Sequence, residues 1–264
     1  MSRVESGNGW TMHLGDCLDV MATLEKVDHV ITDPPYSRVV HASVRSSGRN
    51  SMPDAAEFGC RTRRSVDLGF EHLRPILRRG CAASFARLAR RWVMAFSDAE
   101  SAWLWRTSLS AAGLDHCRVM EWRRLNGAPQ FSGDRPAQSF EPINLAHQPG
   151  RKRWNGGGKQ GVYEFPTVLN RGGRNPREHT SQKPVGLMLA LVADFTDAGE
   201  TILDPFAGSG TTGVACLRLG RRFIGIEREP KYFELACERL RAEEQGLSMT
   251  DARRGQVAMF GGGK

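Results

Sequence analysis

The sequence predicts an α/β fold in which helices cover both faces of a mostly parallel sheet. Strand-like and helix-like segments alternate at both ends of the chain, an order typical of parallel sheets. Two apolar strand segments run directly into distinctive turns, Asp33-Pro-Pro-Tyr36 and Asp204-Pro-Phe-Ala-Gly-Ser-Gly-Thr-Thr212. Ligands bind at the carboxyl ends of strands in such folds. Both turns are therefore candidate functional sites.

The N-terminal elements are short. Residues 10–14 and 29–32 are apolar strand segments, and residues 17–24 carry apolar side chains at helical spacing. Two consecutive prolines follow the second strand and cannot continue it, so the chain must turn there. Residues 37–67 contain many Arg, Ser and Gly residues without clear periodicity. This pattern predicts a basic loop directly after the turn.

The centre and the C-terminal part continue the pattern. Periodicity predicts helices at 70–77, 82–91 and 99–111, and strands at 92–96, 118–123 and 142–147. Residues 126–139 are polar and rich in Gly and Pro, and residues 148–178 are basic and contain a Gly-rich run, which indicates an insertion at about 126–178 around the strand at 142–147. The regular order then resumes with a helix at 184–195, a strand at 201–203, a helix at 212–219, a strand at 222–226 and a helix at 230–244. We expect one domain over residues 1–264.

Charge is distributed unevenly along the 264 residues. The net charge is +8 and the isoelectric point about 9.5. Residues 38–91 contain twelve arginines, no lysine and four acidic residues, and residues 151–178 contain seven basic and two acidic residues. The remainder is net acidic. Two basic blocks on an acidic body predict a polyanionic partner.

Several classes of protein disagree with the sequence. No apolar stretch is long enough to span a membrane, and the N-terminus lacks the apolar core of a secretion signal. The six cysteines contain no C-x-x-C pair and no H-E-x-x-H sequence occurs, so no metal site is expected. A chain of this length has no need of disulfides, and the cytoplasm is the expected compartment.

The Gly-rich turn is suited to a nucleoside. Gly208 and Gly210 allow a tight turn and let a ligand approach main-chain N–H groups at the start of a helix. Glu227 ends the next strand, 17 residues after Gly210, where an acid can accept both ribose hydroxyls. The turn lacks the Lys of a phosphate-binding P-loop, and Asp204 would repel a diphosphate. The ligand expected is a nucleoside with a cationic or zwitterionic tail. The alternative is a plain strand-to-helix turn.

The Asp33–Tyr36 turn is suited to methylation of an exocyclic amine. Such a nitrogen shares its lone pair with an aromatic ring and is a poor nucleophile. The Asp33 carboxylate and the Pro34 carbonyl can accept its hydrogens, and Pro35 helps to fix these acceptors in place. Tyr36 offers a face on which a base can stack. The alternative is a rigid turn with a surface tyrosine.

Together these motifs resemble those of the prokaryotic β-group DNA amino-methyltransferases, which use S-adenosylmethionine. The order also matches, because in that group the Asp-Pro-Pro-Tyr motif precedes the recognition region and the cofactor motif comes last. His179-Thr-Ser-Gln-Lys-Pro184 and Leu14-Gly-Asp16-Cys17 resemble two further segments of the group. The resemblance implies a Rossmann-like, seven-stranded methyltransferase sheet with a circularly permuted motif order, and a target-recognition insertion at about 126–178.

The resemblance also assigns residues to roles. The catalytic turn comprises Asp33, Pro34, Pro35 and Tyr36. Asp16 and Cys17 would hold the adenine of the cofactor, and Glu227 its ribose. The remaining candidates for the sugar and the methionine end of the cofactor are Asp204, Phe206, Gly208, Gly210, Thr211, Ser181 and Lys183.

Double-stranded DNA is the expected partner. An amine inside a duplex is reached only after the base is flipped out, which requires a clamp on the backbone. The candidate DNA-binding residues are Arg45, Arg49, Arg61, Arg63, Arg64, Arg151, Lys152 and Arg153. The alternative for each of them is a solvated charged surface. The resemblance and two tryptophans expected to be exposed, Trp103 and Trp105, also indicate a homodimer.

The leading hypothesis is N6-adenine methylation, because N4-cytosine enzymes of the group more often carry Ser at the position of Asp33. Methylation of RNA guanine or of protein glutamine disagrees in both motif residue and order. A C5-cytosine enzyme disagrees because no Pro-Cys dipeptide occurs. A non-catalytic DNA-binding module of the same fold remains an alternative. Nothing in the chain resembles an endonuclease, so any restriction partner would be a separate protein.

Overall fold

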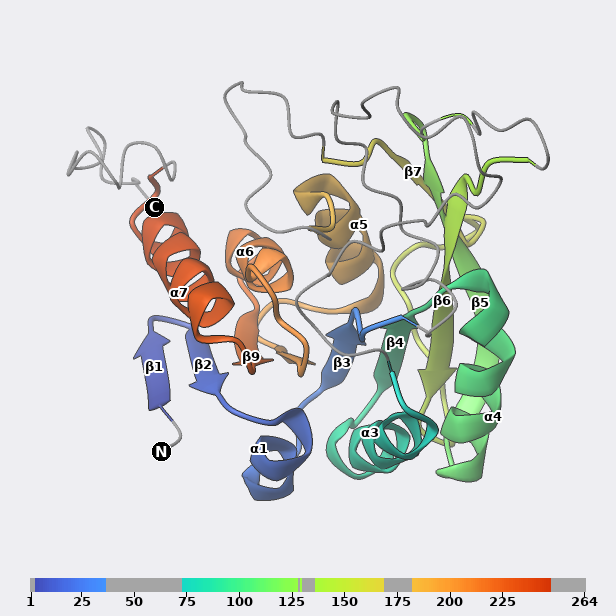
Figure 1. Ribbon diagram of the computed structural model, residues 1–264, viewed down its shortest axis with the longest axis horizontal. Coiled ribbons are helices and arrows are strands. Elements are labelled where there is room, and N and C mark those ends of the chain that lie inside the picture. Colours follow the sequence, from blue (N-terminus) through green and yellow to red (C-terminus); the bar gives the residue numbers. More distant parts are fainter. Residues whose placement is uncertain (1–2, 37–72, 128, 130–135, 169–181, 248–264) are drawn as a thin grey trace, which may run out of the picture.

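The computed structural model describes residues 3–36, 73–127, 129, 136–168 and 182–247. A sheet forms the middle layer, with three helices against each face (Figure 1). In chain order the elements are β1 (Arg3–Gly7), β2 (Trp10–Leu14), α1 (Cys17–Thr23), β3 (His29–Thr32), α3 (Pro75–Leu88), β4 (Trp92–Phe96), a 3₁₀ turn (Ala99–Ser101), α4 (Ala102–Ala111), β5 (Asp115–Arg124), β6 (Phe140–His147), β7 (Val162–Phe165), α5 (Val185–Phe195), β8 (Thr201–Asp204), α6 (Thr211–Arg218), β9 (Arg222–Glu227) and α7 (Pro230–Glu244).

The sheet of the described residues has nine strands in the order β1-β2-β9-β8-β3-β4-β6-β5-β7. Neighbours are parallel from β2 to β4 and between β5 and β7, and antiparallel at β1–β2, β4–β6 and β6–β5. The mostly parallel sheet is thus confirmed, but the expected number of seven strands is too low. The two strands that the sequence did not predict, β1 and β7, lie at the two edges. Both are short and mostly solvent-exposed, so neither carries a clear apolar pattern.

Helix α3 replaces the two helices predicted at 70–77 and 82–91. Pro75 occupies its first turn, where the missing N–H has no helical partner to lose. Gly80 interrupts the apolar pattern but not the helix. A Cβ at Gly80 would lie 3.1 Å from Leu18 Cδ1, so this glycine lets α1 pack closely against α3.

The core is divided by the sheet into two apolar layers. One lies under α5, α6 and α7 and includes Phe195 and Phe223, and the other lies under α1, α3 and α4. In the second layer Phe85 and Trp105 stack with ring centroids 6.2 Å apart. Trp105 is 1% exposed and Trp103 65%. The prediction that both are exposed is therefore wrong for Trp105, which packs inward from α4.

The parallel strands bring the candidate motifs to one edge of the sheet. Strand β3 lies beside β8, with Val30 opposite Leu203, so the turns after these strands are neighbours despite their separation in the chain. Strand β2 lies beside β9, with Leu14 opposite Glu227. This carboxyl edge is the one where ligands bind in such sheets. In the described residues we find no helix whose length and apolarity would let it cross a membrane.

Candidate active site

The Gly-rich turn connects β8 to α6 at the carboxyl edge. Gly208 and Gly210 have positive φ angles of 51° and 75°, a region that favours glycine. A Cβ at Gly210 would also lie 3.1 Å from Ala236 Cβ. The turn therefore requires glycine both for its backbone conformation and for the close approach of α7.

Glu227, at the end of β9, lies beside the Gly-rich turn. Its Oε2 accepts a hydrogen bond from Gly208 N at 2.8 Å, and its Oε1 accepts one from Glu229 N at 2.8 Å. Burial raises the pKa of Glu227, and these backbone donors oppose the rise. The carboxylate is thus held beside the turn, where the resemblance places a ribose.

The buried Asp204 side chain stabilises the Gly-rich turn through hydrogen bonds within the protein. Its Oδ1 accepts hydrogen bonds from Thr32 Oγ1 at 2.8 Å and Phe206 N at 3.1 Å, and its Oδ2 accepts one from Thr212 Oγ1 at 2.6 Å. Burial raises its pKa to about 6, against the effect of these donors. Both carboxylate oxygens are already paired within the protein. Asp204 consequently joins strand β3 to the Gly-rich turn.

Arg239 of α7 supports the turn from another side and was not predicted. Its buried guanidinium donates to Ser209 O at 2.6 Å, Ser209 Oγ at 2.9 Å and Thr211 Oγ1 at 3.2 Å. Helical periodicity gave no signal for this contact, because Arg239 is a charged residue in a helix rich in charge.

The remaining cofactor candidates lie around this turn. Asp16 caps α1 by accepting from Leu18 N at 2.8 Å, and Gly15 N donates to Glu227 O at 3.0 Å. The Asp16–Cys17 segment is therefore anchored next to Glu227. Phe206 is partly buried and packs against the apolar layer below α1. Ser181 lies outside the described residues.

The Asp33 carboxylate lies in a cluster of buried polar groups (residues Asp33, Tyr36, Glu141 and Lys183). Lys183 Nζ lies 2.5 Å from Asp33 Oδ2, 3.1 Å from Tyr36 Oη and 3.1 Å from Glu141 Oε2. The Tyr36 hydroxyl donates a short hydrogen bond to Glu141. Asp33 Oδ1 is buried and has no hydrogen-bond partner among the described residues. One oxygen of the Asp33 carboxylate is thus fixed, while the other is left as an open acceptor.

Aromatic rings enclose the cluster. Lys183 Nζ lies 5.0 Å from the ring centroid of Phe96, 5.3 Å from that of Tyr36 and 5.7 Å from that of Trp122. Such distances are typical of cation–π contact. These rings exclude water from the ammonium and strengthen its interaction with the carboxylates.

The ionisation of the cluster follows from burial and mutual attraction. Burial raises the pKa of Asp33, and the Lys183 charge opposes the rise. Burial would also raise the pKa of Glu141, but Lys183, the Tyr36 hydroxyl and Arg124 outweigh it and the pKa is lowered. Burial would lower the pKa of Lys183, yet Asp33 and Glu141 outweigh it and the pKa is raised. The lysine therefore stays charged between two carboxyl groups.

Sequence reasoning missed two members of this cluster. Lys183 was expected at the methionine end of the cofactor, and Glu141 was not among the candidate site residues. Glu141 reaches the site because β6 runs antiparallel to β4, which places its first residues at the carboxyl edge. The only available signal was its position at the start of a predicted strand.

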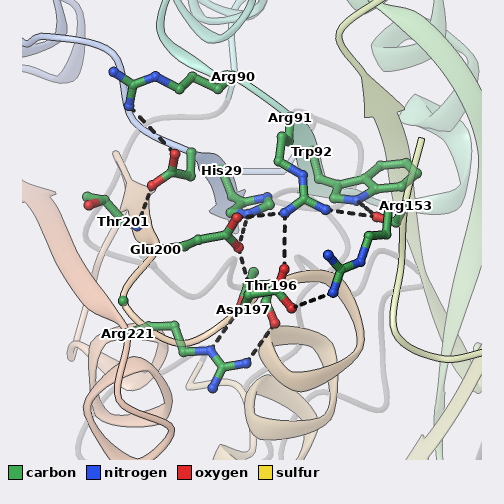
Figure 2. Close-up of polar contacts among 12 residues, drawn as sticks. His29, Arg90, Arg91, Trp92, Arg153, Thr196, Asp197, Glu200, Thr201 and Arg221 are labelled. Carbon is green, nitrogen blue, oxygen red and sulfur yellow. Dashed lines mark hydrogen bonds and ion pairs between the residues drawn. The ribbon is translucent and has the colours of Figure 1, made fainter. Parts of the chain in front are cut away.

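The basic run at 151–153 lies elsewhere. Trp92 Nε1 at the start of β4 donates to Arg153 O at 2.7 Å, and the Arg153 guanidinium pairs with Asp197 at 3.3 Å (Figure 2). Lys152 pairs at 2.7 Å with Asp115, which begins β5. These residues thus line the amino edge of the sheet, and the structure does not bring them together with Asp33. Arg151 is an exposed member of the same segment.

The five other arginines proposed for DNA binding lie outside the described residues. They are Arg45, Arg49, Arg61, Arg63 and Arg64. Tyr36, the last described residue before their segment, lies in the turn after β3.

Comparisons with known proteins agree with this geometry. A profile of the DNA methylase family matches residues 111–238. The type II methyltransferase M2.DpnII of Streptococcus pneumoniae is 33% identical over 149 residues, which are 52% of this chain and 56% of that enzyme. The alignment therefore spans little more than half of this methylase relative.

Solved structures share the fold of this chain over most of its length. The M1.HpyAVI–SAM complex has a TM-score of 0.64 at 24% identity and covers 88% of this chain and 98% of that one. The PvuII DNA methyltransferase, titled cytosine-N4-specific, has a TM-score of 0.66 at 13% identity and covers 93% and 90%. At these identities the likeness establishes the fold of the sheet and its helices.

Proposed function

We propose that the protein is an S-adenosylmethionine-dependent DNA methyltransferase that acts on the exocyclic N6 of an adenine flipped out of a specific duplex sequence. The observation that carries this proposal is Asp33 Oδ1, buried and without a hydrogen-bond partner beside the Gly-rich turn. Leaving a buried acceptor unpaired costs about 1–3 kcal/mol. Such an atom is suited to a donor that arrives with the substrate, and an exocyclic amine is a donor of that kind.

The chemistry of the turn follows from hydrogen bonding. Asp33 Oδ1 and the Pro34 carbonyl accept the two amine hydrogens, which draws the nitrogen lone pair out of the aromatic ring. Tyr36 stacks on the base and holds it in plane. As the new N–CH₃ bond forms, positive charge develops on the nitrogen, and Asp33 stabilises it and accepts the released proton.

The residues of the carboxyl edge fit the proposed cofactor. Gly208 and Gly210 keep the turn narrow, Glu227 lies where a ribose would bind, and Asp16 lies where an adenine would bind. The pocket also carries more carboxyl groups than cationic ones, which suits a positively charged ligand. When bound, S-adenosylmethionine supplies an electrophilic methyl group.

DNA binding is proposed on the basic loop that follows Tyr36. Arginine binds phosphate through two parallel N–H donors, so the arginines of this sequence segment are suited to hold the backbone on both sides of a flipped base. We also propose that residues 1–264 form one catalytic domain and that the protein acts as a homodimer, for which exposed Trp103 is a candidate contact. A place in restriction-modification is in keeping with the type II relative.

N4-cytosine methylation is the second candidate. The fold of the PvuII enzyme, titled cytosine-N4-specific, supports it, and the same acceptors could hold the cytosine amine. Asp at position 33 favours adenine, because the resemblance associates Ser with the cytosine enzymes. A non-catalytic DNA-binding module is disfavoured because Asp33, Tyr36, Gly208 and Glu227 are all in place.

The proposal is tested by the identity of the modified base. The protein is incubated with S-adenosylmethionine and mixed-sequence DNA, and the digested nucleosides are identified by mass spectrometry. We expect N6-methyldeoxyadenosine. N4-methyldeoxycytidine would select the second candidate, and a purified protein that binds no cofactor and produces neither nucleoside would support the non-catalytic alternative.

A further inference from the structure

Lys183 is placed against the catalytic carboxylate. It is 8% exposed and lies just before α5, in the segment His179–Pro184 that the resemblance assigns to the cofactor. Its nearest partner is Asp33 Oδ2 at 2.5 Å. An ammonium group has three N–H donors. Asp33, Tyr36 and Glu141 each lie within 3.1 Å of the nitrogen, so all three donors have acceptors inside the cluster.

The contacts of Lys183 divide the two oxygens of Asp33. The ammonium binds Oδ2, and within the part of the chain that the structure describes Oδ1 has no hydrogen-bond partner. A carboxylate held at one oxygen cannot rotate freely about its Cβ–Cγ bond. The lysine thereby keeps the second oxygen available at a fixed position.

Glu141 opposes the effect of the Lys183 charge on Asp33. Glu141 accepts a hydrogen bond from the Tyr36 hydroxyl and lies 3.1 Å from Lys183 Nζ. Arg124, a residue of β5, places its Nη1 3.5 Å from the Glu141 carboxylate. Each added charge changes the ionisation of Asp33: Lys183 favours its charged form, whereas Glu141 disfavours it. Asp204 on β8 interacts with Asp33 as a further like charge.

We propose that Lys183 and Glu141 are opposed positioning residues for methyl transfer: Lys183 keeps Asp33 ionised with Oδ1 free for the target amine, and Glu141 sets the orientation of Tyr36 and limits the effect of the lysine charge. The inference rests on the proposed function, because it concerns how the same carboxylate is prepared. In this inference Lys183 acts on Asp33 and does not bind the cofactor.

The pH dependence of the reaction distinguishes this role from a merely structural one. Methyl transfer requires ionised Asp33, so the acidic limb of the kcat profile follows its pKa in the complex. Lys183→Met removes a positive neighbour, the pKa of Asp33 rises, and the limb moves to higher pH. Glu141→Gln removes a negative neighbour, the pKa falls, and the limb moves to lower pH. We expect each shift to be about one pH unit, typical of charges at this distance.

Matched variants complete the experiment. Lys183→Arg keeps the charge and is expected to leave the limb near its wild-type position. Lys159→Met removes an exposed lysine that pairs with the buried Asp194 at 2.7 Å, and is expected to change neither the acidic limb nor kcat. The dissociation constant of S-adenosylmethionine, measured by calorimetry, is expected to stay within about twofold of wild type for Lys183→Met.

Three results would overturn the inference. One is a Lys183→Met variant whose affinity for S-adenosylmethionine falls about tenfold while its acidic limb does not move, since that would make Lys183 a cofactor ligand. Another is a pair of shifts in the same direction. If Lys183→Met does not fold, Glu141→Gln alone decides, and an unshifted limb there contradicts the inference. A wild-type protein without methyl transfer would instead contradict the proposed function.

Discussion

The two edges of the parallel sheet carry ionic clusters that look alike in composition and differ in pairing. At the carboxyl edge, Asp33 and Glu141 surround Lys183, and one carboxylate oxygen stays unpaired. At the amino edge, Glu200 and Asp197 surround Arg91 (Figure 2). The difference between the clusters lies in their carboxylate oxygens.

The acids of the amino edge are fully engaged by the protein. Glu200 Oε1 accepts from Arg91 at 2.6 Å, and its Oε2 lies 2.8 Å from His29 Nε2 and accepts from Asp197 N at 2.6 Å. Asp197 Oδ1 accepts from Arg153 at 3.3 Å and its Oδ2 lies 3.6 Å from Arg91. This network joins the starts of β3, β4 and β8 to the basic insertion. Among the described residues, every carboxylate oxygen of Glu200 and Asp197 has a partner, although His29 Nδ1 has none. At the proposed active site, by contrast, one carboxylate oxygen of Asp33 is left open.

The largest expected effect is the loss of methyl transfer in Asp33→Ala. Removal of the acceptor should lower kcat by at least about 10²–10³-fold, as loss of one preorganised polar group does in other enzymes. Binding of S-adenosylmethionine should stay close to wild type, because the hydrogen bonds of Glu227 to the Gly-rich turn do not involve Asp33. The rates are compared below the melting temperature of the variant, since the buried Lys183 loses one of its two carboxylate partners. A variant that methylates DNA at near wild-type rate would remove the catalytic assignment.

Glu200→Gln is expected to lower the stability of the protein and to leave methyl transfer unchanged. It leaves Arg91 and the buried His29 without their carboxylate, which should lower the free energy of unfolding by about 2 kcal/mol. Urea denaturation measures this loss, and kcat at a temperature where the variant is folded should be unchanged. An equal loss of kcat in both variants would erase the contrast between the edges.

The basic segments should differ in their effect on DNA affinity. Replacing Arg61, Arg63 and Arg64 by Ala should weaken binding about tenfold and flatten its dependence on salt, because phosphate contacts release counterions. Replacing the residues at 151–153 should weaken it less, since Lys152 and Arg153 already pair with Asp115 and Asp197. Fluorescence anisotropy over a range of salt concentrations measures both. A larger loss of DNA affinity in the variant at 151–153 would indicate that DNA binds at the amino edge of the sheet.

The smallest expected effect concerns Asp204. Its pKa is raised by burial to about 6 in the folded protein, above the value of an exposed aspartate, so the folded state binds a proton more tightly than the unfolded state. The contribution of this group to stability therefore increases as pH falls through about 6. Between about pH 7 and pH 5 the stability of wild type relative to Asp204→Asn should increase by about 1 kcal/mol. A constant difference in urea denaturation would contradict this.

Local sequence patterns predicted the elements whose boundaries depend on nearby residues. Strands β2 and β4 and helix α7 have the predicted bounds, because apolar alternation and a proline at the helix start define them. Strand β3 also has the predicted bounds, and it pairs with β8. The edge strands escaped prediction because exposed strands carry little apolar pattern.

The composition of the polar cluster could not be predicted in the same way. Asp33 and Lys183 are separated by 150 residues, and their contact depends on where the segment before α5 crosses the sheet. The position of Glu141 in the cluster depends on the direction of β6 in the sheet, and apolar periodicity in the sequence does not reveal strand direction. Arg239 depends on the packing of α7 against a turn that is distant in sequence. Each is a long-range contact created by topology.

The most direct test of the account is the rate of methyl transfer by Asp33→Asn, whose side chain keeps the shape of aspartate and loses the carboxylate. Wild type and variant are compared in a single turnover with methyl-labelled S-adenosylmethionine and DNA. The account predicts labelled DNA from wild type and none from the variant, with equal cofactor affinity for both. Labelling of DNA by Asp33→Asn at the wild-type rate would contradict it.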